Sequence, residues 1–379
     1  MPEISLAMIV RNEEQTLART IESVRDHVSE IVIGVDLKST DGTRQIAERL
    51  ADVVFETRLT DELAMKGPIS GDPSADWGFS KARNDVFDRC RPNAWRLILD
   101  GHETVLDPAA LAPAVEAAMA AGCDGVEVQV WFEPQADGIP QSVFSSQRLA
   151  APSVRYVNPI HNALLVKKAF AAPHIRIEHR KRDQAPVAKL ARDQQRSAAN
   201  IGGLKAETEK QPTNARAWFY LGTAYRENAR PSDAIGAFEE CLKHSRWHEE
   251  RWHARVEAAR CLIALGRVDE GRAQFSQALD EQPVRAEAYY YLGDLAYKQQ
   301  RFHEAMLWLE ACVAMPLPSV RLFLNPRIYL VERHDLLSMV YHHLRMPLKA
   351  AAQAALALTA APNARIEKNM ALWRAAAGG

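Results

Sequence analysis

The sequence predicts an α/β domain with a mostly parallel sheet, followed by an all-helical array of repeats. Two observations predict this architecture. Up to about residue 185, short apolar runs rich in β-branched residues alternate with helical stretches. From residue 186 onward these runs disappear, and Ala-rich amphipathic segments repeat along the chain. We therefore expect two domains, residues 1–185 and residues 186–379.

The first domain begins with a regular alternation of strands and helices. Strands are expected at residues 4–10, 30–36 and 53–56, with helices at 13–28 and 43–51 between them. The strand segments are apolar without alternation, which is typical of parallel strands covered on both faces. Open parallel sheets bind ligands at the carboxyl ends of their strands. The functional residues of this domain should therefore follow its strands.

The second domain contains internal repeats. Its units span residues 212–242, 250–283, 283–313 and 334–362, with an irregular insert at 316–327. In the first and third units, Leu221-Gly222 aligns with Leu292-Gly293. These segments resemble the tetratricopeptide repeat, a pair of stacked helices with a period of about 34 residues. Such arrays usually hold a partner in a concave groove, and the alternative is a rigid buttress for the first domain.

Composition and charge limit the classes of partner. The 379 residues are 47% hydrophobic and carry a net charge of -1. A balanced charge gives no general attraction to nucleic acid or to an anionic membrane, so either partner would need a local basic patch. The five cysteines form no CxxC pair, and no run of about 20 apolar residues is present. We expect a cytoplasmic protein without a transmembrane segment.

Polar side chains follow the expected strands. The first strand leads into "VRNEE", the second into "VDLKSTDGT", and a later apolar run, "WRLIL", into "DGHE". These segments lack both the GxGxxG of a dinucleotide fold and the GxxxxGK of a P-loop. Dehydrogenases and ATPases are therefore disfavoured. Carboxylate and amide groups gathered at one sheet edge suit a nucleotide with its metal.

Four segments, taken in order and spacing, carry a resemblance to a known family. They are "SLAMIVRNEEQTLARTIESV", "EIVIGVDLKSTDGTRQIAE", "FSKARND" and "WRLILDGHETV". Together they resemble the inverting, nucleotide-sugar-dependent glycosyltransferases of family 2, which have the type A fold. The fusion to tetratricopeptide repeats is similar to a known branch of that family. The resemblance implies a hexosyltransferase-like enzyme with a nucleoside diphosphate sugar as donor, and a uridine-linked donor is the expectation.

The resemblance assigns donor-binding roles to the first two strand ends. The loop after the first strand would border the nucleoside through Val10, Asn12 and Glu13. Asp36, at the end of the second strand, would hydrogen-bond the pyrimidine. Asp41 lies one turn further on and is a further donor-site candidate. The alternative for Asp41 is a turn or helix cap that accepts backbone N–H groups at the start of the next helix.

Two later motifs are expected to contact the diphosphate. "FSKARND" resembles the family's "DFSxARN", with Gly78 in place of the usual acid, and its Arg83 would face the phosphates because a guanidinium matches phosphate oxygens. "LDGHE" resembles the family's "LDADE". Asp100 takes the first acidic position, as a catalytic, donor-binding and metal-binding residue, and His102 replaces the second aspartate.

The histidine bears on the metal. Mg²⁺ prefers all-oxygen shells, whereas Mn²⁺ tolerates imidazole better, so Mn²⁺ or Mg²⁺ is the expected cofactor. In the alternative, His102 packs or caps a turn and Asp100 alone holds the ion. Beyond these motifs, "YVNPIHNALLV" resembles the family's "Y.G.VHE.L", with Asn162 in place of the glutamate. The later segment "IRIEHRKR" resembles a following I.H pattern of the family. His161 and His179 are thus further metal-ligand candidates, with satisfied core histidines as the alternative.

An inverting transfer also needs a general base. Glu103 is the expected base because it follows the metal-binding strand, and Glu127, Glu133 and Asp137 are the alternatives. The acceptor, partly presented by the repeats, is a glycan or lipid-linked glycan, a peptide or protein, or a hydroxylated DNA base. The rival hypothesis is a scaffold whose transferase domain has decayed. The departures at Gly78, His102 and Asn162 would then mark lost activity.

Overall fold

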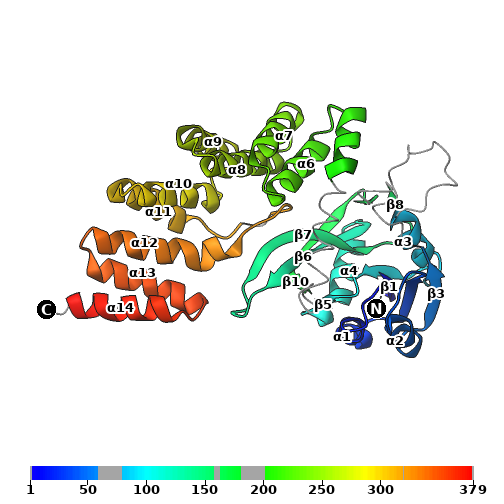
Figure 1. The fold of residues 1–379 in the computed structure, drawn as a ribbon. Coiled ribbons are helices and arrows are strands. Elements are labelled where there is room, and N and C mark those ends of the chain that lie inside the picture. Colours follow the sequence, from blue (N-terminus) through cyan, green and yellow to red (C-terminus); the bar gives the residue numbers. More distant parts are fainter. Residues whose placement is uncertain (1, 59–78, 158–162, 181–200, 319, 378–379) are drawn as a thin grey trace. The chain divides into compact units, whose positions relative to one another are not determined.

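The chain forms an α/β sheet unit and a helical unit, which confirms the predicted fold class (Figure 1). The computed structural model describes residues 2–58, 79–157, 163–180, 201–318 and 320–377. The first compact unit comprises Met1–Pro134 and Val143–Leu190. The second comprises Gln135–Ser142 and Ala191–Gly379.

The first unit is built on a mixed sheet. Within the described residues, the sheet has eight strands in the order β3-β2-β1-β4-β7-β6-β10-β5. Its strands are β1 (Ile4–Val10), β2 (Glu30–Asp36), β3 (Val53–Thr57), β4 (Trp95–Ile98), β5 (Glu103–Val105), β6 (Gly125–Pro134), β7 (Pro140–Ala150) and β10 (Ala169–His179). Strands β1, β2, β3 and β4 run parallel, as do β6 and β10, while β7 and β5 run antiparallel to β4 and β10. A short hairpin of β8 (Tyr156–Val157) and β9 (Ala163–Leu164) lies outside this sheet.

Helices cover both faces of the sheet, as the unbroken apolar strands predict. The helices are α1 (Leu17–Glu22), α2 (Thr43–Leu50), α3 (Phe79–Phe87) and α4 (Leu111–Ala120), with 3-10 turns at Arg25–His27 and Pro108–Ala110. In β1, Leu6 and Met8 belong to the core that includes residues of α1, α2 and α4. Ala7, between them, packs in a second core with Val86 and Phe87 of α3. Successive strand residues point to opposite faces, so one apolar run fills both cores.

The helix expected over residues 13–28 is shorter in the structure. It begins at Leu17, ends at Glu22, and is followed by the 3-10 turn at Arg25–His27. Ser23 donates its hydroxyl to the carbonyl oxygen of Thr20 at 2.7 Å, and Val24 has the non-helical φ/ψ pair -130°/-3°. A side-chain bond to the backbone competes with helix continuation. The chain turns before residue 28 for this local reason.

The second unit is an array of paired antiparallel helices. Its helices are α6 (Ala215–Glu227), α7 (Pro231–His244), α8 (His248–Ala264), α9 (Val268–Glu281), α10 (Ala286–Lys298), α11 (Phe302–Ala314), α12 (Arg333–His343), α13 (Pro347–Ala360) and α14 (Ala364–Ala377). Residues 201–210 are helical as well, and a π-helical turn at Ile328–Glu332 precedes α12. Figure 1 shows α6 to α13 stacked in sequence order, coloured from green to orange.

The aligned glycines of the repeats allow close packing within two helix pairs. A Cβ on Gly222 of α6 would lie 2.7 Å from the ring of Phe238 in α7. A Cβ on Gly293 of α10 would lie 2.6 Å from Leu309 in α11. Both distances are too short for ordinary carbon contacts. The Leu-Gly pair therefore recurs because a larger residue would push the paired helices apart.

Candidate metal centre and donor site

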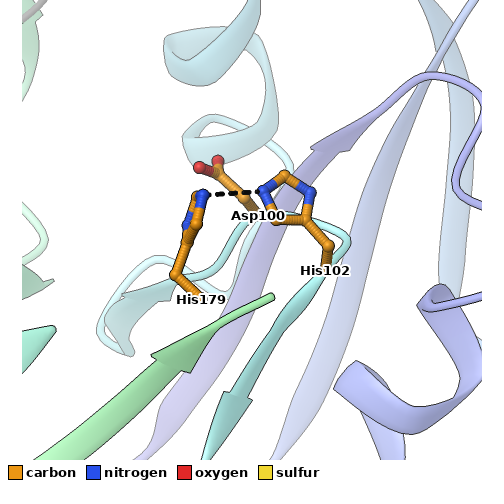
Figure 2. Close-up of side chains that lie close together, drawn as sticks. All are labelled: Asp100, His102 and His179. Carbon is orange, nitrogen blue, oxygen red and sulfur yellow. Dashed lines mark hydrogen bonds between the residues drawn. The ribbon is translucent and has the colours of Figure 1, made fainter. Parts of the chain in front are cut away.

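Three potential ligands meet at the carboxyl edge of the sheet. Asp100 lies two residues past the end of β4, His102 is in the turn that follows, and His179 is the last residue of β10. One ligand atom from each of the three lies within 4.8 Å of the others. Figure 2 shows the carboxylate of Asp100 and the two imidazoles turned toward one another. Residues 77 positions apart in sequence are thus brought together.

Strand register explains how His179 reaches this turn. Strand β10 pairs with β5, and this pairing sets His179 opposite Glu103. The turn itself is closed by two hydrogen bonds between Asp100 and Glu103. The backbone N–H of Glu103 donates to the Asp100 carbonyl at 3.0 Å, and that of Asp100 donates to Oε2 of Glu103 at 2.9 Å. Asp100 and His102 therefore project from a fixed turn.

A carboxylate from the first strand loop holds the ring of His102. Its Nδ1 lies 3.0 Å from Oε1 of Glu13. An ionised carboxylate only accepts hydrogen bonds, so Nδ1 is the donor. Burial lowers the pKa of His102, but the hydrogen bond to Glu13 and the nearby carboxylates outweigh burial and raise it. The Nε2 atom of His102 is left facing His179.

A second carboxylate holds the ring of His179. Its Nδ1 lies 3.0 Å from Oε1 of Glu103, which also accepts a hydrogen bond from Nη2 of Arg148 at 2.6 Å. Glu103 is 0% exposed, so this contact lies wholly inside the protein. The ring of Phe132 stacks on His179 with 5.0 Å between centroids. The imidazole of His179 is thus fixed on its face and at Nδ1.

The donor set fits a divalent ion. The two Nε2 atoms are 3.2 Å apart, and with both Nδ1 atoms donating, their lone pairs need a proton or a cation between them. In an octahedral shell with bonds of about 2.1 Å, neighbouring ligand atoms lie about 3 Å apart. Two imidazoles and one carboxylate suit Mn²⁺ and other transition ions better than Mg²⁺. We therefore take Asp100, His102 and His179 as the candidate metal ligands.

Arg83 links this cluster to the hairpin of β8 and β9. Its Nη2 donates to Oδ1 of Asp100 at 3.2 Å, and its Nη1 donates to the hydroxyl of Tyr156 at 2.8 Å. The side chain of Asn84, the next residue of α3, makes two hydrogen bonds to the backbone of Tyr156. Its Oδ1 accepts the Tyr156 N–H at 2.9 Å, and its Nδ2 donates to the Tyr156 carbonyl oxygen at 3.0 Å. Burial raises the pKa of Asp100, but Arg83, Arg148 and the imidazoles lower it well below its usual range. Asp100 is therefore an anion, ready to ligate a cation.

Two loops at this edge of the sheet are tied to each other. The Oδ1 of Asn12 accepts the backbone N–H of Thr40 at 2.8 Å, and Asn12 has a left-handed φ of 56°. Asp41 accepts the backbone N–H of Thr43 at 3.1 Å and that of Glu14 at 3.2 Å. Asp41 thus accepts a backbone N–H group at the start of α2, which was the alternative to a donor-binding role. It also holds the loop after β1 through the N–H of Glu14.

The end of β2 carries a buried acid. Asp36 is 2% exposed, and its Oδ2 lies 3.1 Å from Nη1 of Arg11. Val10 is 1% exposed within the core, so its side chain packs against apolar neighbours. Strands β1, β2 and β4 run parallel, so Arg11, Asp36 and Asp100 follow strand ends at the same edge of the sheet.

Other residues named from the sequence either fall outside the described residues or do not belong to this cluster. His161, Gly78 and Asn162 fall outside the described residues. Among the alternative bases, Glu127 is within β6, and Asp137 forms an ion pair with Arg327 at 2.7 Å inside the second unit. Glu133 is 6% exposed, has a left-handed φ of 48°, and directly follows Phe132, which is paired with His179 in the sheet.

Four residues of this site escaped the sequence analysis or received a different role there. Arg148, Tyr156 and Gly101 were not considered, and Glu13 was expected at the nucleoside. The one local signal was Gly101, which stands where the resembled motif "LDADE" has alanine. The contacts of Arg148 and Glu13 join segments 45 and 89 residues apart, and no spacing rule predicts them.

Comparison with known proteins identifies both units. Residues 5–142 match the family model "Glycosyl transferase family 2". Residues 188–246 and 256–315 match the "Tetratricopeptide repeat" model. The first matched segment is thus similar to family 2 glycosyltransferases, and the later segments are similar to tetratricopeptide repeats.

Individual relatives match parts of the chain. A "TPR repeat-containing protein" of Synechococcus elongatus is 28% identical over 167 residues, which is 42% of this chain and 35% of the relative. The chain thus spans about a third of the length of that curated relative. The crystal structure of MamA is 16% identical, with a TM-score of 0.37, over 46% of this chain and 95% of that one. YrrB, "a TPR protein with an unusual peptide-binding site", is 14% identical, with a TM-score of 0.36, over 47% of this chain and 85% of that one. Among the described residues, no helix is both long and apolar enough to cross a bilayer.

Proposed function

We propose that the chain transfers a sugar, with inversion, from a uridine diphosphate sugar to an acceptor hydroxyl in a metal-dependent reaction. The observation that supports this most strongly is the cluster of Asp100, His102 and His179 at the carboxyl edge of the sheet. Arg83 lies beside that cluster, 3.2 Å from Asp100. A cation and a guanidinium together suit a diphosphate, because both stabilise the negative charge that builds on the leaving group.

In this proposal, the carboxyl edge of the sheet binds the donor, with Asp36 at the nucleoside and Arg83 at the diphosphate. Asp36 would accept a hydrogen bond from the pyrimidine, in exchange for part of its contact with Arg11. Asn12, in the loop after β1, accepts a hydrogen bond from the backbone N–H of Thr40 and so ties this loop to the one after β2. The diphosphate would lie against Arg83, whose orientation is fixed by the hydroxyl of Tyr156. A donor bound in this way points its sugar away from the buried nucleoside end.

Catalysis would be a direct displacement at the anomeric carbon. The acceptor oxygen forms a bond to that carbon, the bond from the carbon to the diphosphate oxygen breaks, and the nucleoside diphosphate leaves. A bound divalent ion supplies Lewis-acid stabilisation of that leaving group. Asp100, His102 and His179 would hold the ion, and Arg83 would hold the phosphates. In this step, these four residues orient the leaving group.

The acceptor proton needs a base, and for that role we propose Glu133 in place of Glu103. Glu103 is fully buried, and its two oxygens accept hydrogen bonds from Arg148, His179 and the backbone of Asp100. Glu133 follows directly after Phe132, whose ring stacks on His179. Its left-handed backbone is unusual for a glutamate, and strained residues concentrate at functional sites.

The repeats are proposed to recruit or present the acceptor. Tetratricopeptide arrays bind protein segments, so a peptide or protein acceptor, or a protein that carries a glycan, fits this domain best. We propose a transferase domain of residues 1–185 and a repeat domain of residues 186–379. The net charge of -1 gives a DNA acceptor no support.

Donor cleavage tests the proposal without knowledge of the acceptor. Purified full-length protein is incubated with a panel of nucleoside diphosphate sugars and Mn²⁺, and release of the diphosphate is followed by ³¹P NMR. We expect slow hydrolysis of a uridine-linked donor, a β-anomer product from an α-linked donor, and loss of both in excess chelator. Binding without cleavage of any donor would favour a decayed transferase domain that serves as a scaffold.

A further inference from the structure

The two imidazoles of the candidate centre have matching surroundings. Each donates its Nδ1 hydrogen to one glutamate at 3.0 Å, His102 to Glu13 and His179 to Glu103. Each leaves its Nε2 facing the other, at 3.2 Å. The two glutamates come from different places, Glu13 from the loop after β1 and Glu103 from the start of β5. The same contact, from an imidazole Nδ1 to a glutamate, thus occurs at both histidines.

We infer that Glu13 and Glu103 are positioning residues for the metal centre, each of which fixes the tautomer and the direction of one imidazole. A histidine that binds metal through Nε2 commonly donates Nδ1–H to a carboxylate, which orients the ring and strengthens the ligand. This inference rests on the proposed metal-dependent function and changes the roles of both residues. Glu13 acts on His102 instead of on the nucleoside, and Glu103 acts on His179 instead of on the acceptor proton.

Gly101 provides independent support for the role of Glu13. A Cβ at position 101 would lie 2.6 Å from Cγ of Glu13 and 2.9 Å from its Cβ. The Cβ of Glu13 cannot move without its backbone, so even alanine would displace this side chain. The family motif that "LDGHE" resembles has alanine at position 101 and aspartate at position 102. Glycine and histidine therefore occur together for a physical reason, because only glycine gives Glu13 room to reach His102.

Arg148 explains how Glu103 can be buried here. Its Nη2 lies 2.6 Å from Oε1 of Glu103, which is 0% exposed. A buried carboxylate without a cation would be costly. Arg148 pairs with the same Glu103 oxygen that lies 3.0 Å from Nδ1 of His179. The centre thus holds the anionic side chains Asp100, Glu13 and Glu103 against the guanidiniums of Arg83 and Arg148.

The predicted ion follows from this shell. Two neutral imidazoles, each backed by a carboxylate, form a nitrogen-rich site that binds Mn²⁺, Co²⁺ or Zn²⁺ in preference to Mg²⁺. The family's aspartate at position 102 would supply an oxygen, whereas this chain supplies a nitrogen from His102 and takes the negative charge from Glu13. The ligand atom is thus on His102, and the negative charge is on Glu13.

Metal titration of the full-length protein tests the inference apart from any reaction. Mn²⁺ and Co²⁺ affinities are measured by calorimetry, and the Co²⁺ absorption bands report the ligand geometry. Glu13→Gln and Gly101→Ala should each weaken Mn²⁺ binding by about 10- to 100-fold and alter the Co²⁺ bands. The double variant should be no weaker than the more affected single variant, because both substitutions act through His102. Glu14→Gln is the matched control, since Glu14 bonds the backbone of Gly42 and no imidazole.

Glu103 is tested in a background that removes its buried counter-charge. Glu103→Gln combined with Arg148→Met avoids an unpaired guanidinium and should weaken Mn²⁺ binding by a similar factor. Wild-type affinity and Co²⁺ bands in Glu13→Gln, or additive losses with Gly101→Ala, would overturn the inference while leaving metal-dependent transfer intact. Tight metal binding by a wild-type protein that neither binds nor cleaves a donor would instead overturn the proposed function and leave the positioning roles in place.

Discussion

Two buried clusters, one in each unit, contain histidines that are equally shielded from water. His102 and His179 in the sheet unit are 7% and 8% exposed, and His253 in α8 of the helical unit is 7% exposed. Burial lowers the pKa of His253 well below its ordinary value, and nearby Arg285 lowers it further. His102 instead has a raised pKa because Glu13 outweighs burial. Two equally buried histidines thus have pKa values shifted in opposite directions, because His102 contacts a carboxylate and His253 lies near a guanidinium.

The two clusters also differ in where their polar atoms point. In the helical unit, Arg285 is closed off by Glu287 at 2.6 Å and stacks over the ring of Trp252 at 3.8 Å. The hydroxyl of Tyr329 completes that pair with a 2.5 Å bond to Glu287. In the sheet unit, the charged groups turn ligand atoms toward a common point. We therefore expect changes in the first cluster to affect stability and changes in the second to affect binding and transfer.

The largest expected effect is on the helical cluster. Arg285→Met leaves Glu287 as a buried carboxylate without its cation, which should lower the free energy of unfolding of the helical unit by about 3–5 kcal/mol. Chemical denaturation followed by circular dichroism measures this loss. Arg267→Met is the matched control, because its pair with Glu270 is roughly half exposed and therefore contributes little to stability. Equal losses in the two variants would show that the buried pair is not structural.

In the sheet cluster, Asp100→Asn should leave stability nearly unchanged and remove function. The substitution keeps the shape of the side chain but takes away the anionic ligand beside Arg83. Donor cleavage should fall by about 100- to 1000-fold, the range seen when one electrostatic stabiliser of a transition state is lost. Initial rates at saturating Mn²⁺ measure this. Asp107→Asn, which alters the Arg176 pair, serves as the control and should retain the wild-type rate.

A smaller effect is expected at the nucleoside end. Asp36→Asn removes a charged hydrogen-bond acceptor, so affinity for uridine diphosphate should fall by about 1.5–3 kcal/mol, or roughly 10- to 150-fold. Calorimetric titration of wild type and variant measures this difference. Unchanged affinity would remove Asp36 from the donor site and leave its pair with Arg11 as its only role.

The smallest effect concerns pH and His253. Because its folded pKa lies below its unfolded value of about 6.5, the unfolded state binds the extra proton as pH falls below 6.5. Stability should therefore be lost on acidification by about 1.4 kcal/mol per pH unit at most. His253→Phe removes this contribution, so its unfolding free energy should depend less on pH between 6.5 and 5. An unaltered pH dependence would show that other groups control acid sensitivity.

The limits of prediction from sequence can be seen in these same residues. Strands β1, β2 and β3 follow from local apolar runs, and the gathering of polar residues at one sheet edge follows from their parallel order. The partners of the imidazoles do not, because Glu13 and His102 are 89 residues apart and meet only through tertiary packing. His253 has no motif at all, and its environment depends on which helices stack. Local patterns predict elements, whereas side-chain partners depend on register and packing.

The most direct test of the account is pulsed electron paramagnetic resonance of Mn²⁺ bound to the protein with uridine diphosphate. The account predicts couplings to two directly bound histidine nitrogens and, in the same spectrum, to ³¹P of the diphosphate. His102→Ala and His179→Ala should each remove one nitrogen coupling. Phosphorus coupling without nitrogen would mean that Asp100 holds the ion alone. Nitrogen coupling without phosphorus would mean that the two-histidine centre is not the donor site, which would contradict the central claim.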